Sequence, residues 1–238
     1  MTTTALRGKR IVITRPEGEA VRLAQRLEAL GAVPVVAPAI EIEFTDPPEL
    51  DAALQRIRSY DWVIFTSRNG VTAVYRRTAA IEGPKIAAIG PATAQALRAH
   101  GVEPDLMPEE YVAEAVLEAL GNVGGLRILL PRAEMAREVL PEGLESRGAA
   151  VDVIAAYRTR RAPVSAERVA AADAITFTSS STVRGFLETA SVPAGAKVIC
   201  IGPITAATAR DLGLHVDLVA DEYTEDGLIA ALAATFGR

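Results

Sequence analysis

Turns that carry hydroxyl groups or begin with Gly-Pro are the part of this sequence best suited to chemistry. Each is expected to follow a short apolar strand and to begin a helix. Hydroxyl groups and the free backbone amides at a helix start both bind carboxylates and phosphates. The pattern therefore predicts a site for a large anionic ligand. These turns are Thr14-Arg15-Pro16, Thr66-Ser67-Arg68-Asn69-Gly70, Gly90-Pro91-Ala92-Thr93, Pro131-Arg132-Ala133-Glu134, Thr178-Ser179-Ser180-Ser181 and Gly202-Pro203-Ile204-Thr205.

Helix capping is the competing interpretation of every one of these hydroxyl groups. A Ser or Thr cap stabilises a helix by about 1 kcal/mol, and capping alone would explain any single turn. Capping needs only one oxygen, however, and Thr66-Ser67 and Thr178-Ser179 each supply two. Gly90-Pro91 and Gly202-Pro203 place proline at the first helical position and leave the next amides uncovered. Two matching sets of turns favour a ligand held in a cleft between two domains.

The usual catalytic groupings do not occur in the sequence. There is no Ser/His/Asp or Cys/His candidate and no H-E-x-x-H motif, and neither Gly-Pro turn reads as a nucleotide-binding loop. Tyr157 is expected at the end of a strand, where its phenol can donate one proton or hydrogen bond. An amphipathic tyrosine at a strand end is the equally simple alternative. The pattern favours chemistry that depends on substrate reactivity and on conformational control.

Short β-branched runs alternate with helical spacing along the whole chain. Ala20, Leu23, Ala24 and Leu27 recur at helical spacing between Gly18 and Gly31. This alternation predicts parallel sheets covered by helices on both faces, which is an α/β fold. The expected strands are 10–14, 33–37, 62–65, 85–89, 105–107, 128–130, 151–154, 175–177, 198–201 and 216–219.

The same pattern is written twice. Phe65-Thr66-Ser67 recurs 112 positions later as Phe177-Thr178-Ser179, and Ile89-Gly90-Pro91 recurs at the same distance as Ile201-Gly202-Pro203. Upstream, Arg10-Ile11 recurs as Arg127-Ile128, 117 positions later. The repeat distance therefore changes by five residues along the chain. This difference locates an insertion between about residues 41 and 59, a stretch interpreted as a connection. The period is that of a duplicated domain-sized unit.

Composition excludes several classes of protein. The 238 residues carry a net charge of −5 without a basic run, so nucleic acid is not an expected partner. No apolar run approaches the roughly 20 residues that span a bilayer, and a cytoplasmic protein is expected. Cys200 is the one cysteine, and His100 and His215 are expected in solvated loops. No metal site or cofactor is predicted.

Taken together, these segments resemble the uroporphyrinogen-III synthase family over essentially the whole chain. The resemblance lies in the joint order and spacing of the segments. They are Ile13–Glu17, Ile64–Ser67, Ile89–Ala94, Leu130–Glu134 with Arg137-Glu138, Val153–Thr159, Phe177–Ser181 and Ile201–Ala206.

The resemblance implies a lyase without a cofactor that closes a linear tetrapyrrole, hydroxymethylbilane. In the family's scheme the terminal hydroxyl leaves to give an azafulvene, a spiro intermediate forms, and the ring recloses as uroporphyrinogen III with ring D inverted. A transient contact with hydroxymethylbilane synthase and a monomeric state are also implied. Backbone amides and hydroxyl groups suit such a polycarboxylate substrate, because this acidic chain lacks arginine clusters.

The resemblance also implies roles for particular residues. Tyr157 occupies the family's tyrosine position and would help the hydroxyl to leave. Arg68 and Ser180 stand where family members often carry proline or a small residue, so Arg68 is expected either to touch a carboxylate or to be solvated. The full set of expected substrate-binding residues is Arg15, Thr66, Ser67, Arg68, Asn69, Gly90, Pro91, Thr93, Ser179, Ser180, Ser181, Gly202 and Thr205.

The implied fold is two similar flavodoxin-like α/β domains with parallel sheets, internally duplicated and joined by a two-stranded β linker. The first domain is discontinuous and comprises residues 1–38 and 160–238. The second comprises residues 42–154. Residues 39–41 and 155–159 would be crossover hinge strands that permit opening and closing.

Two other functions remain open from the residues alone. A non-catalytic two-lobed protein that binds a small anionic molecule would share the duplicated fold and the cleft. A nucleotide-sugar or phosphate transferase is disfavoured, because neither a general base nor metal ligands are evident.

Overall fold

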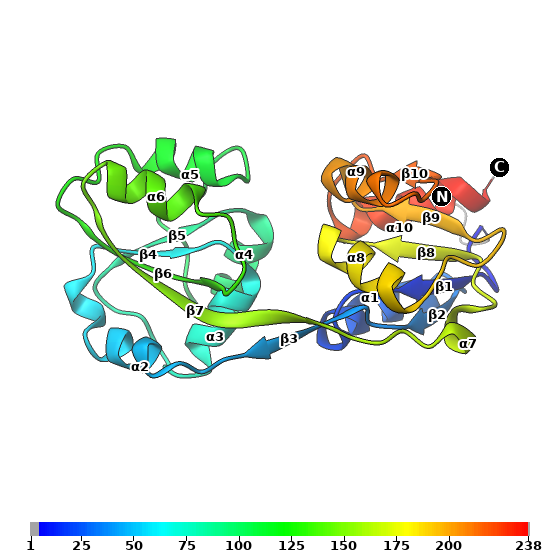
Figure 1. Cartoon of the computed structure of the whole chain (residues 1–238), viewed down its shortest axis with the longest axis horizontal. Helices are drawn as coiled ribbons and strands as arrows, with labels where there is room; N and C mark the ends of the chain where they lie inside the picture. The colour runs from blue at the N-terminus through cyan, green and yellow to red at the C-terminus, as the bar shows by residue number, and fades with distance from the viewer. Residues whose placement is uncertain (1–4, 238) are drawn as a thin grey trace. The chain divides into compact units, whose positions relative to one another are not determined.

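The chain forms two compact α/β units in a computed structural model that describes residues 5–237. The first unit comprises the chain up to Glu41 and again from Arg160 onward, and the second comprises Ile42–Thr159. The chain therefore leaves the first unit once and returns to it once. Figure 1 labels the helices and strands of each unit.

The first unit is built on a five-stranded sheet in the order β10-β9-β8-β1-β2. All of its pairings are parallel. Its strands are β1 (Arg10–Ile13), β2 (Val33–Val36), β8 (Ala174–Phe177), β9 (Lys197–Cys200) and β10 (Leu218–Val219). Its helices are α1 (Glu17–Ala29), α7 (Ala166–Val169), α8 (Ser180–Thr189), α9 (Pro203–Asp211) and α10 (Glu225–Phe236).

Helices cover both faces of this sheet because its strands are apolar on both sides. Leu23 and Leu27 of α1 pack with Leu228 and Leu232 of α10 over one face. Phe186 of α8 packs with residues such as Ala206 of α9 over the other face. Buried strands of this kind are typical of parallel sheets. The prediction of an α/β fold with parallel sheets is confirmed.

The second unit has the sheet order β3-β7-β6-β4-β5. The pairings among β7, β6, β4 and β5 are parallel. Its strands are β3 (Ile40–Phe44), β4 (Trp62–Phe65), β5 (Lys85–Ala88), β6 (Arg127–Ala133) and β7 (Ala150–Arg161). Its helices are α2 (Pro48–Gln55), the 3-10 helix η1 (Ile57–Ser59), α3 (Arg68–Tyr75), α4 (Pro91–Arg98), α5 (Ala113–Leu120) and α6 (Val139–Ser146).

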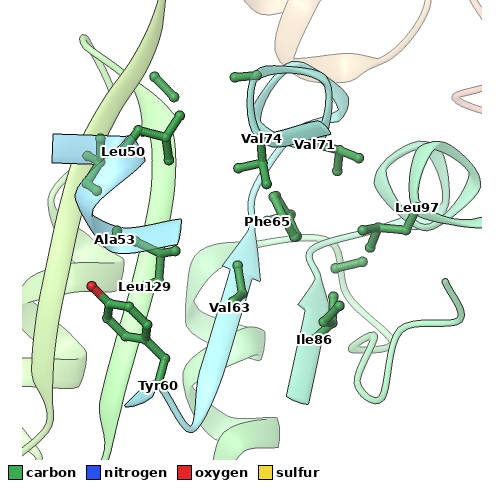
Figure 2. Packing of buried hydrophobic residues seen from close by; sticks show 14 of the residues in the cluster. Leu50, Ala53, Tyr60, Val63, Phe65, Val71, Val74, Ile86, Leu97 and Leu129 are labelled. Atoms are coloured by element: carbon green, nitrogen blue, oxygen red, sulfur yellow. The ribbon is translucent and has the colours of Figure 1, made fainter. Parts of the chain in front are cut away.

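One half of this core lies beneath α2, α3 and α4. Figure 2 shows Leu50 and Ala53 of α2 close to Leu129, while Val71 and Val74 of α3 lie over Phe65. On the opposite face, α5 and α6 pack side chains such as Val116 and Leu144 against the sheet. The strand ends that carry the candidate residues are therefore held between two helical layers.

The two sheets repeat one strand order, as the duplication requires. Shifting β4 by 112 positions gives β8, and shifting β5 gives β9, while β6 and β7 correspond to β1 and β2 at 117 positions. Even the weak outer pairing recurs, because the parallel bridge Ala87↔Leu106 corresponds to the β9–β10 pair Ile199↔Leu218. Each sheet thus takes strands from both copies of the repeat.

Three local predictions were wrong. Residues 105–107 form no strand and contribute only the single bridge at Leu106, since the run is too short to continue the ladder. The insertion interpreted as a connection contains the helix α2, whose Leu50 and Ala53 are fully buried. The first three residues of the turn expected at Pro131–Glu134 instead belong to β6, which continues to Ala133 because it pairs with β7.

Candidate active site

Two of the predicted turns begin their helices in nearly the same way. Ser67 precedes α3 with φ −161° and ψ 157°, and its side chain accepts a hydrogen bond from the Gly70 amide at 3.0 Å. Ser179 precedes α8 with φ −163° and ψ 161°, and its side chain accepts from the Thr182 amide at 3.2 Å. Both serines are helix caps, so capping explains one hydrogen bond of each hydroxyl group.

The phenol of Tyr157 lies on the Ser67 cap. Its oxygen is 2.7 Å from the Ser67 hydroxyl, although the two residues are 90 positions apart. Tyr157 is only 6% exposed, and it lies within β7 rather than at the strand end where it was expected. Strand β7 extends further because Ala133 of β6 still pairs with Tyr157 after a register shift. The long strand thereby carries the phenol to the start of α3.

A cavity of about 310 Å³ within the second unit has Tyr157 and Thr66 in its wall. The turn residues Arg68 and Asn69, next to Thr66, are half-buried. The cavity combines apolar walls with hydroxyl and guanidinium groups, as small-molecule sites commonly do. Its remaining lining residues are Ile89, Tyr111, Val112, Ala113, Leu130, Arg132, Ala133, Met135, Ala136, Arg137 and Leu140.

Several of these cavity residues have no binding role in the sequence prediction. Arg132 is 7% exposed, and its guanidinium group donates to the Arg137 carbonyl at 3.1 Å and to the Glu138 carboxylate. It therefore holds the segment after β6 against the cavity. Met135 is 88% exposed beside the same opening. Arg132 and Arg137 do lie in the segments that carry the family resemblance, and that position in the sequence could have marked them as site residues.

The Gly-Pro turns begin helices whose first amides are only partly engaged, since the Thr93 amide already donates to the Gly90 carbonyl at 3.1 Å. Among the described residues, neither Gly90 before α4 nor Gly202 before α9 is accompanied by a side-chain cap. Their φ angles of −172° and −169° suit any residue, so the need for glycine has another cause. A Cβ on Gly90 would lie 3.1 Å from the Tyr111 ring, and one on Gly202 would lie 3.2 Å from the Tyr223 ring. Both tyrosines thus pack on these turns.

Thr93 and Thr205 lie in the first turns of these two helices. They are 3% and 5% exposed and therefore buried, whereas Pro91 is exposed at the surface. The helix N-terminus has a positive partial charge, and a carboxylate near it is stabilised. The arrangement in each unit suits a carboxylate that takes hydrogen bonds mainly from the backbone.

In the first unit, Ser179 and Ser180 each contact another hydroxyl group. The hydroxyl of Ser179 lies 2.9 Å from that of Ser181, and the hydroxyl of Ser180 lies 2.7 Å from that of Thr208 on α9. Arg15 is turned inward, with its side chain 4% exposed and its Nη1 atom 2.6 Å from Glu225. This buried ion pair fixes the start of α10 to the end of β1.

The carboxyl groups with clearly shifted pKa values lie away from this end of the sheets. Asp173 accepts the Arg10 amide at 2.8 Å at the start of β1, and this bond, with Lys9, lowers the pKa of the carboxyl. A hydrogen bond from Tyr60 lowers the pKa of Asp152 at the start of β7. Both carboxyl groups therefore lie at the N-terminal ends of strands, which is the end of each sheet opposite to the candidate residues. Among residues 5–237 no three His, Cys, Asp or Glu side chains are grouped to hold a metal ion.

Comparison with known proteins decides the family. The family model for uroporphyrinogen-III synthase HemD matches residues 21–230. The uroporphyrinogen-III synthase of Synechococcus elongatus is 36% identical over 98% of this chain and 97% of its own length. The chain belongs to the uroporphyrinogen-III synthase family. A putative uroporphyrinogen-III synthase from Methanothermobacter thermautotrophicus is 34% identical over 96% of this chain and 99% of its own.

Solved uroporphyrinogen-III synthase structures share the fold. One from Helicobacter pylori gives a TM-score of 0.66 at 19% identity and covers 95% of this chain and 99% of its own. A mutant from Thermus thermophilus gives 0.64 at 19% identity and covers 96% and 99%. No helix in the described part of this family member is long and apolar enough to cross a membrane.

Proposed function

We propose that this protein converts linear hydroxymethylbilane to uroporphyrinogen III, releasing water and inverting ring D through a spiro intermediate. Relatives that cover nearly the whole chain carry the name of this enzyme. The observation that carries the proposal within the site is the placement of Tyr157. Its phenol is buried in the wall of a cavity beside the capped start of α3.

The substrate is a polycarboxylate, and the turns supply its hydrogen-bond donors. The uncapped amides of α4 and α9, with Thr93 and Thr205 beside them, suit carboxylates without a charged clamp. The hydroxyl groups of Thr66 and Ser181 add further donors, each on its own unit. Arg15 contributes indirectly, because its guanidinium group is committed to Glu225.

Tyr157 acts as the proton donor for departure of the terminal hydroxyl. The phenol proton joins the hydroxyl to give water, and the substrate is left as the cationic azafulvene. When the spiro intermediate opens and ring D recloses through its free α-carbon, that carbon loses its hydrogen as a proton, and this proton restores the phenol. General acid assistance of this kind typically accelerates a reaction by about 10² to 10⁴ fold.

Most of the remaining catalysis is orientation. The activated substrate is reactive without a cofactor. The enzyme therefore accelerates the reaction by holding the two ends of the tetrapyrrole so that the inner carbon of the last ring attacks, and by excluding direct closure. Effective concentrations from such positioning can be very large. We infer a monomeric cytoplasmic enzyme that receives its substrate through transient contact with hydroxymethylbilane synthase.

Product analysis tests the function directly. The purified protein is supplied with hydroxymethylbilane from its synthase, and the uroporphyrinogen isomers are separated after oxidation. Isomer III is expected. Formation of isomer I alone, at the rate seen without the protein, would instead favour a non-catalytic binding protein, the alternative that the family match does not favour.

A further inference from the structure

Arg15 and Arg132 occupy the same position in the two copies of the repeat, 117 residues apart, but they have different partners. Arg15 binds Glu225, the first residue of α10, at 2.6 Å. Arg132 binds Glu138, the residue before α6, and the Arg137 carbonyl. In the first unit the arginine therefore fixes the start of α10, whereas in the second unit it fixes the segment that follows its own strand.

The start of α5 lacks the acidic side chain that its counterpart α10 carries. In the 112-residue register of the repeat, Val112 and Ala113 correspond to Thr224 and Glu225. Ala113 is 8% exposed and is the first residue of α5, as Glu225 is of α10. Val112 and Ala113 both line the cavity of about 310 Å³, together with Arg132. The side chain that meets the arginine in the first unit is thus a methyl group in the second unit, and this methyl group is part of a cavity wall.

The cavity matches one substituted aromatic ring in size and in chemistry. Small-molecule pockets commonly measure about 300 to 1,000 Å³, so a cavity of about 310 Å³ suits one ring of a tetrapyrrole rather than all four. Tyr111 contributes an aromatic wall, and Leu130 and Leu140 contribute apolar contacts. The charged residues in the described lining are Arg132 and Arg137, and both are cationic. An aromatic ring that carries carboxylates fits this lining.

Arg137 is the cationic group that a ligand carboxylate can recruit. Its Nη1 atom lies 3.6 Å from the Glu114 carboxylate, and the two side chains are 69% and 52% exposed. Exposed ion pairs of this kind contribute little, so Arg137 can exchange Glu114 for a carboxylate of the ligand at low cost. Arg132 has a side chain that is only 9% exposed, and it keeps its internal partners. It holds the backbone of Arg137 beside the opening.

We infer that Ala113 is a specificity-determining residue, whose small side chain leaves a pocket in the second unit for one carboxylate-bearing pyrrole ring of the substrate. The inference rests on the proposed function for the choice of ring. Tyr157 lies in the same wall, so the pocket takes the terminal ring whose hydroxyl departs. The ring packs against Tyr111 and the apolar walls, and Arg137 binds one of its carboxylates. The pocket thereby fixes the end of the tetrapyrrole from which water leaves.

Refilling the pocket tests this inference. Ala113→Glu introduces the residue of the first unit, and an acidic side chain at the first position of a helix, beside Arg132, should leave the protein folded. The variant should lower kcat/KM by about 10-fold or more, because the added side chain excludes the ring. Ala113→Leu fills the same space without a charge and should cause a similar loss.

Ala119→Glu is the matched control, because it places the same side chain at an exposed position of α5. It should keep the wild-type kcat/KM. Circular dichroism verifies that each variant is folded. Wild-type kcat/KM in either folded Ala113 variant overturns the inference, and so does an equal loss of kcat/KM in Ala119→Glu.

The methyl group of Met135 provides a readout of binding that needs no turnover. Met135 is 88% exposed in the wall of the pocket, and Met107 lies in the same unit outside the described lining. The probe is a single pyrrole with one acetate and one propionate side chain, added to protein whose methionine methyl groups are isotope-labelled for nuclear magnetic resonance. The probe should shift the Met135 resonance saturably, leave the Met107 resonance unchanged, and have no effect on Ala113→Glu.

The two measurements separate failure of the pocket from failure of the proposed function. An unshifted Met135 resonance in the wild type, or equal shifts of Met135 and Met107, overturns the inference. Isomer I alone from the wild type, with a saturable shift of Met135, overturns the proposed function and leaves the pocket in place.

Discussion

The two Thr-Ser turns are alike in backbone and different in what their serine hydroxyl groups contact. Ser67 and Ser179 share extended angles and cap α3 and α8, but only Ser67 holds a phenol among the described residues. The difference begins in the strand that passes each turn. Strand β2 ends at Val36, whereas its counterpart β7 runs for 12 residues and still pairs with β6 at Tyr157. Both copies keep the cap, and the longer neighbouring strand gives one copy a buried phenol beside it.

Of the substitutions that test the difference between the two turns, Tyr157→Phe should change activity most. It removes the phenol proton and leaves the ring packed, so kcat should fall by about 100-fold while far-ultraviolet circular dichroism stays unchanged. Tyr223→Phe in the first unit is the control, because Tyr223 is 65% exposed and should be replaceable. Wild-type turnover in Tyr157→Phe would remove the phenol from the mechanism.

The buried arginines Arg15 and Arg132 should differ next most, in how much folding stability is lost when each is replaced. Arg15→Met leaves Glu225 only 21% exposed and should cost about 2 kcal/mol, with Arg22 and Arg26 near enough to offset part of the loss. Arg132→Met leaves Glu138 55% exposed and should cost about 1 kcal/mol. Trp62, the single tryptophan, reports urea unfolding of the second unit, and circular dichroism reports both units. A larger loss in Arg132→Met would contradict this ranking.

Thr93→Ala and Thr205→Ala should be mild and similar in size. Each change removes one hydroxyl group but leaves the amides of α4 or α9 in place, so kcat/KM should fall by less than about 10-fold. Steady-state kinetics of both variants measure the effect. Complete loss of activity in either variant, with the fold intact, would show that side chains rather than amides dominate carboxylate binding.

Asp173→Asn should have the smallest effect, and that effect depends on pH. The pKa of Asp173 is lowered by its bond from the Arg10 amide, so its contribution is present above the unfolded-state pKa, near 4, and is lost as pH falls through the lower folded pKa. At pH 7 the cost should be under about 1 kcal/mol, because the side chain is 35% exposed. Denaturation at several pH values should show the gap closing below about pH 4. A gap that persists there would exclude charge as the cause.

The regular parts of both sheets followed from short apolar runs. The strand predicted at 62–65 is β4, and the helical spacing between Gly18 and Gly31 is α1. The alternation of Ile40, Ile42 and Phe44 with glutamates is a strand signal, and it is β3, which continues to Phe44 beyond the hinge strand expected at 39–41. Local pattern succeeds where burial on both faces decides the structure.

Contacts between residues far apart in the chain could not be predicted from the sequence. The Ser67–Tyr157 contact depends on how far β7 continues along β6, and that depends on a register shift next to Ala133. Pro131 suggested a turn because proline lacks an amide hydrogen, yet it lies within β6, where its carbonyl oxygen would be 2.8 Å from a Cβ placed on Gly70. Similarly, the charge of Arg15 suggested a ligand contact, while its partner Glu225 is 210 positions away.

The discontinuity of the first unit also sets an order of assembly on the ribosome. Its interior strand β1 pairs with β8, so Ile11 must wait for Ala174 to be synthesised. The whole second unit, Ile42–Thr159, leaves the ribosome during that interval and contains every strand of its own sheet except the start of β3 and the end of β7. The middle of the chain can therefore fold before its beginning, and β1 stays an open edge until translation is well past residue 174.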